Sequence, residues 1–116
     1  MPRVLKLRKG WEFSKIFRTG IRIHGELVRL LFVRDDSDTI RFGCAVGKRL
    51  GKAHVRNRGK RILRAAFSQF EKKLIPGLHI ILTLKEKGIG AKSQDIAGEL
   101  EKLFRRKKLL CFPVLQ

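Results

Sequence analysis

The sequence predicts a single α+β domain in which helices pack on one face of a small mixed β-sheet. Helical and strand-like segments follow one another in the order helix, two strands, helix, strand, helix, which is typical of a two-layer arrangement. A chain of 116 residues fits one domain, and its 43% of hydrophobic residues suffices for one packed core. We expect the domain to span residues 1–108 and to be followed by an apolar tail, residues 109–116, whose role the sequence does not explain.

The first element is a short helix, expected from Trp11 to Arg18. Phe13, Ile16 and Phe17 recur on one face of it at a spacing of three and four residues. Gly20 follows at the place where a glycine commonly ends a helix. The segment therefore has one apolar side to bury and a defined end.

Two strands are expected next, from Leu27 to Val33 and from Ile40 to Val46. The first is rich in branched apolar residues, and the second alternates apolar residues with small or polar ones. The segment between them, Arg34 to Thr39, is polar and contains three aspartates, which favours a turn. The two strands are therefore predicted to form a hairpin.

A long helix is expected from Ala53 to Lys73, followed by a buried strand from Leu78 to Leu84. The last helix should run from Gln94 to Lys108, with Ser93 as its N-cap. Basic residues fill its last turn, where they suit the helix dipole. These elements complete the predicted layer of helices and strands.

The net charge is the strongest functional signal. The chain has 28 Lys and Arg against 10 Asp and Glu, which gives a formal net charge of +18. Such an excess repels itself in a compact domain and is typical of a protein that binds a polyanion. No signal peptide, membrane-spanning run or lipidation motif is recognisable, and Cys44 and Cys111 have no metal-binding or disulfide spacing. We therefore expect a cytoplasmic protein with reduced thiols and no membrane partner.

The positive charge is concentrated between residues 48 and 64, and residues 40–69 contain no acid. At about 100° per residue, one arc of the long helix is apolar and the opposite arc carries Asn57, Arg61 and Arg64. Arginine binds phosphate with a planar fork, whereas a solvated helix face normally mixes charges of both signs. We therefore interpret this face as a phosphate-binding surface, with an ordinary solvated face as the alternative.

The run from Lys48 to Phe67, KRLGKAHVRNRGKRILRAAF, resembles the signature of the bacterial ribonuclease P proteins. That family carries K-x-x-G-x-A, then Arg-Asn-Arg, then Lys-Arg and a further Arg one turn later, and the order here is continuous. The segment from Leu7 to Gly20 and the last helix are also similar to the family. The resemblance implies the protein subunit of ribonuclease P, the RNA-based endoribonuclease that removes the 5′ leader from precursor tRNA.

By this resemblance, the basic helix binds the RNA subunit of that enzyme. The residues carried over are Lys52, Arg56, Asn57, Arg58, Lys60, Arg61 and Arg64. The RNA is implied to do the chemistry and to bind most of the Mg²⁺, so that the protein has no catalytic residue, metal site or small-molecule substrate of its own. The family also implies a left-handed β-α-β crossover through the basic helix, against the usual right-handed rule, in a two-layer sandwich like that of some ribosomal proteins.

The predicted sheet suggests a second surface. Gly43, Ala45 and Gly47 follow one side of the second strand, and small residues in a strand often mark the close approach of a ligand. Phe13 and Phe17 could border this cleft and stack on bases, although phenylalanines at this spacing are more often core residues. The resemblance implies that the cleft binds the 5′ leader. The candidates carried over are Phe13, Phe17, Arg29, Leu31, Ala45, Gly47 and Lys48.

Other kinds of site find little support in the sequence. His24, His54 and His79 share no metal-ligand spacing, and the aspartates of residues 34–39 are typical of a turn rather than a cation site. No acid–base pair for hydrolysis is apparent. A structural RNA-binding protein of the ribosome is the alternative function, and a protein-only nuclease or a DNA-binding protein fits less well.

Overall fold

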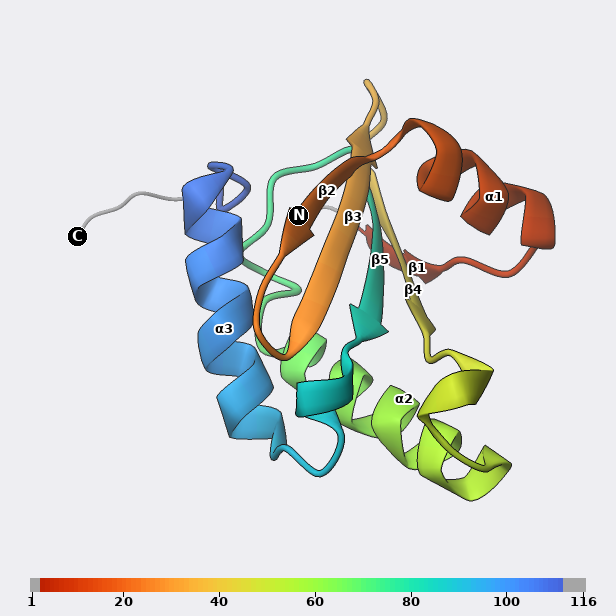
Figure 1. Cartoon of the computed structure of the whole chain (residues 1–116). Helices are drawn as coiled ribbons and strands as arrows, with labels where there is room; N and C mark the ends of the chain where they lie inside the picture. The colour runs from red at the N-terminus through yellow and green to blue at the C-terminus, as the bar shows by residue number, and fades with distance from the viewer. Residues whose placement is uncertain (1–2, 112–116) are drawn as a thin grey trace.

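The structure is a computed structural model that describes residues 3 to 111. Within this range the chain forms five strands, three α-helices and two short 3₁₀ turns, as drawn in Figure 1. In chain order they are β1 (Arg3–Lys6), α1 (Gly10–Thr19), β2 (Ile21–His24), β3 (Val28–Arg34), β4 (Thr39–Ala45), η1 (Lys48–Leu50), α2 (Ala53–Ser68), β5 (Leu78–Leu84), η2 (Glu86–Gly88) and α3 (Ser93–Arg106). None of the helices in the described range is long and apolar enough to cross a membrane.

The strands form one mixed sheet in the order β1-β4-β5-β3-β2, so the predicted α+β class with a small mixed sheet is confirmed. β4 pairs in parallel with both β1 and β5, whereas β3 pairs antiparallel with both β5 and β2. α2 connects the neighbouring parallel strands β4 and β5. This connection is the β-α-β unit for which the family resemblance implies a left-handed crossover.

The predicted hairpin between residues 27 and 46 is wrong, because β5 lies between β3 and β4. The polar segment that joins these two strands instead passes beside the start of β5. The Asp35 amide donates to the Gly77 carbonyl at 2.9 Å, and the Gly77 amide donates to the Thr39 carbonyl at 3.0 Å. Gly77 has a φ of +83°, and a Cβ atom there would overlap the Asp35 carbonyl oxygen, so the crossing requires glycine.

The two outer strands, β1 and β2, were not predicted from the sequence. Each has only four residues and mixes basic side chains with apolar ones. The hairpin partner of β3 is β2, which precedes it in the chain, and not β4. Charged residues on short edge strands discourage pairing with other chains, and they also weaken the pattern by which a strand is recognised.

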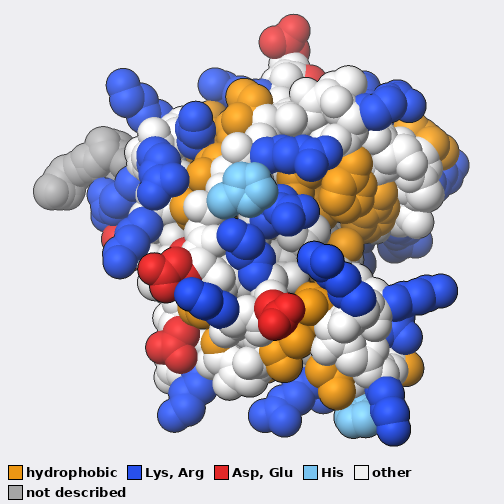
Figure 2. Space-filling model, viewed as in Figure 1, with side chains coloured by type: hydrophobic (Ala, Val, Ile, Leu, Met, Phe, Trp, Pro, Cys, Tyr) orange, Lys and Arg blue, Asp and Glu red, His pale blue; other side chains and the backbone are white. Residues whose placement is uncertain are grey.

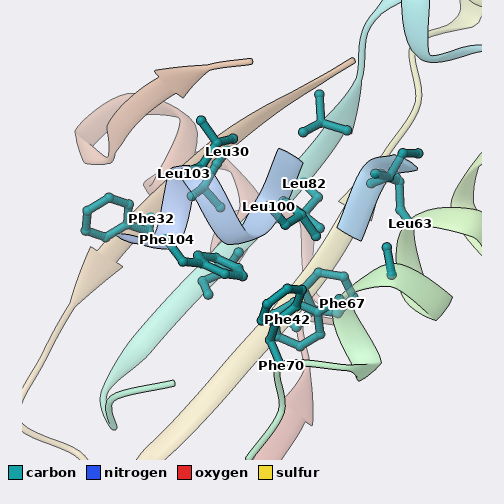
Figure 3. Packing of buried hydrophobic residues seen from close by; sticks show 14 of the residues in the cluster. Leu30, Phe32, Phe42, Leu63, Phe67, Phe70, Leu82, Leu100, Leu103 and Phe104 are labelled. Carbon is teal, nitrogen blue, oxygen red and sulfur yellow. The ribbon is translucent and has the colours of Figure 1, made fainter. Parts of the chain in front are cut away.

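The sheet is covered on both faces. α2 and α3 lie on one face and enclose the main core, whose aromatic and leucine side chains interlock in Figure 3. α1 lies on the opposite face, above a smaller cluster that includes Ile16, Leu31 and Ile81. The prediction that helices pack on one face thus holds for α2 and α3, whereas α1 departs from it. The physical reason is that β3 and β5 are apolar on both sides, so their second face also needs cover.

Most helix ends differ from their predicted positions, and the end of α2 differs most. α2 ends at Ser68 rather than at Lys73, and residues 69–73 continue as turns. Lys92, and not Ser93, is the N-cap residue of α3, and the Lys92 amide donates to the carboxylate of Asp95 at 3.3 Å. This side-chain hydrogen bond closes the first turn in place of the expected serine cap.

The predicted apolar tail begins inside the fold. Leu109 is buried in the main core, and its amide donates to the Phe104 carbonyl at 2.9 Å. Leu110 pairs with Leu74 in an isolated antiparallel bridge. The first residues of the tail therefore help to close the core beyond the end of α3, and residues 112–116 lie outside the described range.

Candidate nucleic-acid interface

One face of α2 carries a row of basic side chains. Of the seven residues predicted to bind RNA, Arg56 and Lys60 are half-buried and five are exposed, namely Lys52, Asn57, Arg58, Arg61 and Arg64. Among residues 3–111, no carboxylate lies within salt-bridge distance of any of them. The structure thus places six of these residues along α2, with Lys52 as its N-cap residue, and leaves their charges available to an external anion.

The buried face of α2 fixes this orientation. Leu63 and Phe67 are buried in the main core. Gly59 approaches the sheet so closely that a Cβ atom there would lie 3.1 Å from a side-chain carbon of Leu84 and 3.4 Å from one of Val46. The helix cannot turn about its axis without exposing these apolar contacts, so its basic face is held outward.

Arg56 has a different role from its neighbours. Its Nε donates a hydrogen bond to the Gly51 carbonyl at 3.2 Å, which ties the turn before α2 to the first turn of the helix. Gly51 itself has a φ of +148°, a conformation that glycine favours. Because Nε is already used, only the two Nη groups of Arg56 remain for a phosphate.

The opposite face of the sheet carries a groove of about 640 Å³ below α1. Four residues of the predicted cleft line it, namely Phe17, Arg29, Ala45 and Gly47. Figure 2 shows Lys and Arg side chains around the hollow that separates α1 from the turn before α2. The small residues Ala45 and Gly47 leave its floor open, and four Lys and Arg residues against two glutamates line it, which suits an extended polyanionic strand.

The other three predicted cleft residues lie outside the groove lining. Leu31 is fully buried under α1, so its side chain has no surface for a ligand, and the prediction that it contacts the leader is corrected to a packing role. Phe13 is half-buried in the same cluster and covers Gly43, where a Cβ atom would lie 2.6 Å from a ring carbon. Lys48 is exposed at the start of η1. Phe17 both packs against the cluster and lines the groove, so the core and cleft interpretations both apply to it.

The groove also contains residues that the sequence does not predict, most clearly Thr83. Thr83 pairs with Ala45 on one side and with Arg29 on the other, so the floor of the groove is a row across three strands. The Nε of Arg29 is buried and has no hydrogen-bond partner within residues 3–111. Arg49 and Lys85 add cations from turns at the groove edge. The alternation of side chains along β5 predicts the face of the sheet on which Thr83 lies. Only the strand order shows that Thr83 is next to Ala45 on that face.

A carboxylate from α3 holds one wall of the groove. Glu99 accepts hydrogen bonds from three consecutive amides of the β2–β3 turn, those of Glu26, Leu27 and Val28, at distances between 2.8 and 3.1 Å. Glu26 and its neighbour Gly25 line the groove. α3 therefore positions this wall through contacts with the turn between β2 and β3.

Replacing Glu99 by glutamine is expected to loosen this turn. A side-chain amide offers one accepting oxygen in place of two, so one of the three backbone donors loses its acceptor and all three lose a charged partner. The free energy of unfolding should therefore fall by about 1–3 kcal/mol. Hydrogen exchange at the Leu27 amide, followed by NMR, should become faster than in the unchanged protein. Glu101→Gln is the matched control, because Glu101 is exposed and its side chain bonds to no residue of the range 3–111 other than Arg105. Equal exchange rates at Leu27 in both variants would contradict the role of Glu99 in holding the turn between β2 and β3.

Two of the remaining titratable groups, Cys44 and Asp35, have a shifted pKa. The described residues contain no group of three or more His, Cys, Asp or Glu side chains that could hold a metal ion. Burial raises the pKa of the Cys44 thiol to about 12, although the nearby Arg64 and Lys60 charges act against the shift. A thiol of this pKa is neutral at pH 7 and is a poor nucleophile. Hydrogen bonds from Ser37 lower the pKa of Asp35, whose carboxylate lies 2.8 Å from His79 at the far end of the sheet.

Comparison with known proteins gives a consistent set of similarities. A sequence model of the family described as Ribonuclease P matches residues 1–108. The chain is 30% identical to the ribonuclease P protein component of Synechocystis sp., over 95% of this chain and 90% of that protein. It is 33% identical to the ribonuclease P protein component of Nitratiruptor sp., over 93% of this chain and 96% of that protein.

Solved structures agree in fold. The ribonuclease P protein from Thermotoga maritima superposes with a TM-score of 0.77 at 27% identity, over 87% of this chain and 96% of that one. A structure of the Staphylococcus aureus ribonuclease P protein gives a TM-score of 0.76 at 22% identity, over 90% of this chain and 95% of that one. The similarity thus extends over nearly the whole of each chain.

Proposed function

This chain belongs to the ribonuclease P protein family, and from that premise we propose that α2 holds the catalytic RNA subunit while the groove below α1 holds the 5′ leader of precursor tRNA. The general role follows from the family. The chain is a protein component of ribonuclease P, an endoribonuclease of tRNA 5′ processing, and its partner is RNA. The ribosomal alternative is therefore set aside.

The observation that carries the proposal is the unpaired basic face of α2. Arg58, Arg61 and Arg64 are exposed, and no carboxylate of residues 3–111 pairs with them. Guanidinium groups bind phosphate oxygens in pairs, and their positions on one rigid helix match a folded RNA backbone better than a flexible tail would. Release of the counterions condensed on the RNA would supply much of the affinity.

The groove supports the second half of the proposal. Ala45, Gly47 and Thr83 have small side chains, which leave room in the groove for a single nucleic-acid strand. The Phe17 ring lies at the edge, where a base could stack on it. Arg29 has a buried donor within this floor that has no partner among residues 3–111. These features suit single-stranded RNA, which is held by stacking and by contacts to its backbone.

Three further parts of the proposal concern the surroundings of the protein. We assign the hydrolytic chemistry to the RNA subunit, with Mg²⁺ bound mainly by that RNA. The described residues of the protein do not group into a Mg²⁺ site. A cytoplasmic location follows from the substrate, because precursor tRNA in bacteria is made in that compartment.

Reconstitution of the holoenzyme tests this function. A bacterial ribonuclease P RNA is incubated with precursor tRNA at a Mg²⁺ concentration too low for the RNA alone, with and without this protein. Cleavage is expected only when both subunits are present, because the protein neutralises phosphates that Mg²⁺ would otherwise have to screen. Cleavage by the protein without RNA would contradict the proposal and indicate a protein-only nuclease.

The groove is tested with the same holoenzyme by comparing its affinity for precursor tRNA with that for leaderless tRNA. The unchanged protein should favour the precursor. Ala45→Leu fills the floor of the groove, so it should reduce this preference several-fold while leaving affinity for the RNA subunit unchanged. An unchanged preference in the Ala45→Leu holoenzyme would place the leader elsewhere.

A further inference from the structure

A second group of basic residues lies at the far end of the helical layer, where α2 and α3 both end. We call it the C-terminal basic cluster. It consists of Lys72, Lys73, Arg105, Arg106, Lys107 and Lys108. All six residues are exposed, and Figure 2 shows Lys and Arg side chains gathered over the end of α3. None of them belongs to the α2 face or to the groove described above.

Contacts between two distant chain segments bring this cluster together. The Phe70 and Phe104 rings meet edge to face with 5.1 Å between their centroids, which joins the end of α2 to the end of α3. The Cys111 amide donates to the Lys73 carbonyl at 2.6 Å, so the chain after α3 runs back along the segment that carries Lys72 and Lys73. The cluster is therefore a fixed surface feature with cations from both segments.

The helix dipole accounts for only part of this cluster. Basic residues in the last turn of a helix suit its negative end, and Arg105 and Arg106 occupy that position in α3. Lys72 and Lys73 come from outside any helix, and Lys108 lies beyond the end of α3 with a φ of +58°. A positive φ is unfavourable for lysine, and glycine or asparagine would fit this position better. The chain nevertheless has a cation there.

Most of the charge in the cluster is unneutralised. Glu101 bonds to Arg105 at 3.0 Å, and Lys73 lies over the Phe70 ring with its Nζ 5.9 Å from the centroid. Five members have no carboxylate within salt-bridge distance among residues 3–111, namely Lys72, Lys73, Arg106, Lys107 and Lys108. Concentrated charge of one sign without internal partners is complementary to a polyanion.

We propose that the C-terminal basic cluster is a further RNA-binding surface, which contacts a segment of the sugar-phosphate backbone of the RNA subunit beyond the segment held by α2. This inference rests on the proposed function of α2. Lys72 follows shortly after Ser68, the last residue of α2, so the two surfaces adjoin at the end of that helix. One RNA chain can therefore run along the basic face of α2 and continue past its end onto the cluster.

The test uses the full chain with Lys72, Arg106 and Lys107 replaced together by glutamine. Their side chains form no ion pair within residues 3–111, and Lys108 is kept because of its backbone conformation. The matched control, Arg8→Gln with Lys15→Gln and Arg34→Gln, removes the same charge from exposed positions elsewhere. Affinity for the RNA subunit is measured over a series of salt concentrations. The cluster variant should bind on the order of 10- to 100-fold more weakly. The slope of the logarithm of the binding constant against the logarithm of the salt concentration should be less steep by about 2–3, because about three phosphate contacts are lost.

Hydroxyl-radical footprinting of the RNA subunit separates this inference from the proposed function. The cluster variant should no longer protect one segment of the RNA from cleavage. It should still protect a second segment, which becomes unprotected in the α2 variant, Arg61→Gln with Arg64→Gln. If the α2 variant binds weakly and the cluster variant binds like its control, the inference is wrong and the function of α2 stands. If the α2 variant keeps full affinity, the function proposed for α2 is wrong. A cluster variant that keeps affinity for the RNA subunit but loses affinity for mature tRNA would overturn the choice of partner.

Discussion

A protein with Arg61 and Arg64 both replaced by glutamine is expected to bind the RNA subunit on the order of 100-fold more weakly. Each arginine is exposed on α2 and has no internal counterion among the described residues. A charge-assisted hydrogen bond contributes roughly 1.5–3 kcal/mol, and the lower end of this range applied to two contacts gives a loss of that size. The holoenzyme should then need a higher Mg²⁺ concentration for half-maximal cleavage of precursor tRNA.

The matched control for this variant is Lys15→Gln with Arg34→Gln, which removes two exposed charges away from α2. Both proteins should unfold at similar urea concentrations, because none of the four positions is buried. If the two variants show the same affinity and the same Mg²⁺ requirement, net charge alone drives association and the α2 face has no special role. Affinity measured at several salt concentrations gives a second comparison of the two variants, through the slope of the logarithm of the binding constant against the logarithm of the salt concentration.

The largest effect on stability is expected from Phe67→Ala. The Phe67 ring is 1% exposed and stacks on Phe42, with 3.8 Å between the ring centroids and an angle of 2° between the ring planes. It joins the buried side of α2 to β4, as the stacked pair in Figure 3 shows. Truncation removes the ring from the core and leaves a cavity, which costs about 3–5 kcal/mol. Single domains are stable by only about 5–15 kcal/mol, so this variant should be close to unfolding.

Urea unfolding followed by far-UV circular dichroism measures this loss. Trp11→Ala is the control, because the Trp11 side chain is 64% exposed and its removal should change the free energy of unfolding by less than about 0.5 kcal/mol. A loss of under about 1 kcal/mol in Phe67→Ala would mean that α2 is not held by this packing. The outward direction of its arginines would then have no structural explanation.

The amino-acid sequence contains enough information to predict α2 and its two faces. Helical periodicity is a local property, so the buried positions of Leu63 and Phe67 and the exposed positions of Arg61 and Arg64 all follow from one repeat. The family resemblance rests on the same stretch of chain. For this reason the surface proposed to bind the RNA subunit can be identified from the sequence alone.

The sheet could be predicted only in part, because strand order is a non-local property. The segment of β5 was located correctly, but nothing near it in the sequence indicates that it inserts between β3 and β4. The same insertion places Thr83 beside Ala45, which is why the groove floor was predicted incompletely. The prediction for Leu31 is wrong because α1 covers the second face of the sheet. The apolar patterns of α1 and β3 predict that both segments are buried, but they do not predict that the two segments pack against each other.

The central claim is that the outer face of α2 lies against the RNA subunit, and a tethered cleavage reagent tests it most directly. Ala65 is exposed between the arginines of this face and the end of α2, and Asp36 is exposed on the connection between β3 and β4. Cys111 is exposed and is replaced by serine, whereas Cys44 can stay because its half-buried thiol remains protonated. An iron chelate attached at Ala65→Cys should cut the RNA subunit at defined positions in the holoenzyme, and one attached at Asp36→Cys should not. Cutting from Asp36→Cys with none from Ala65→Cys would contradict the claim.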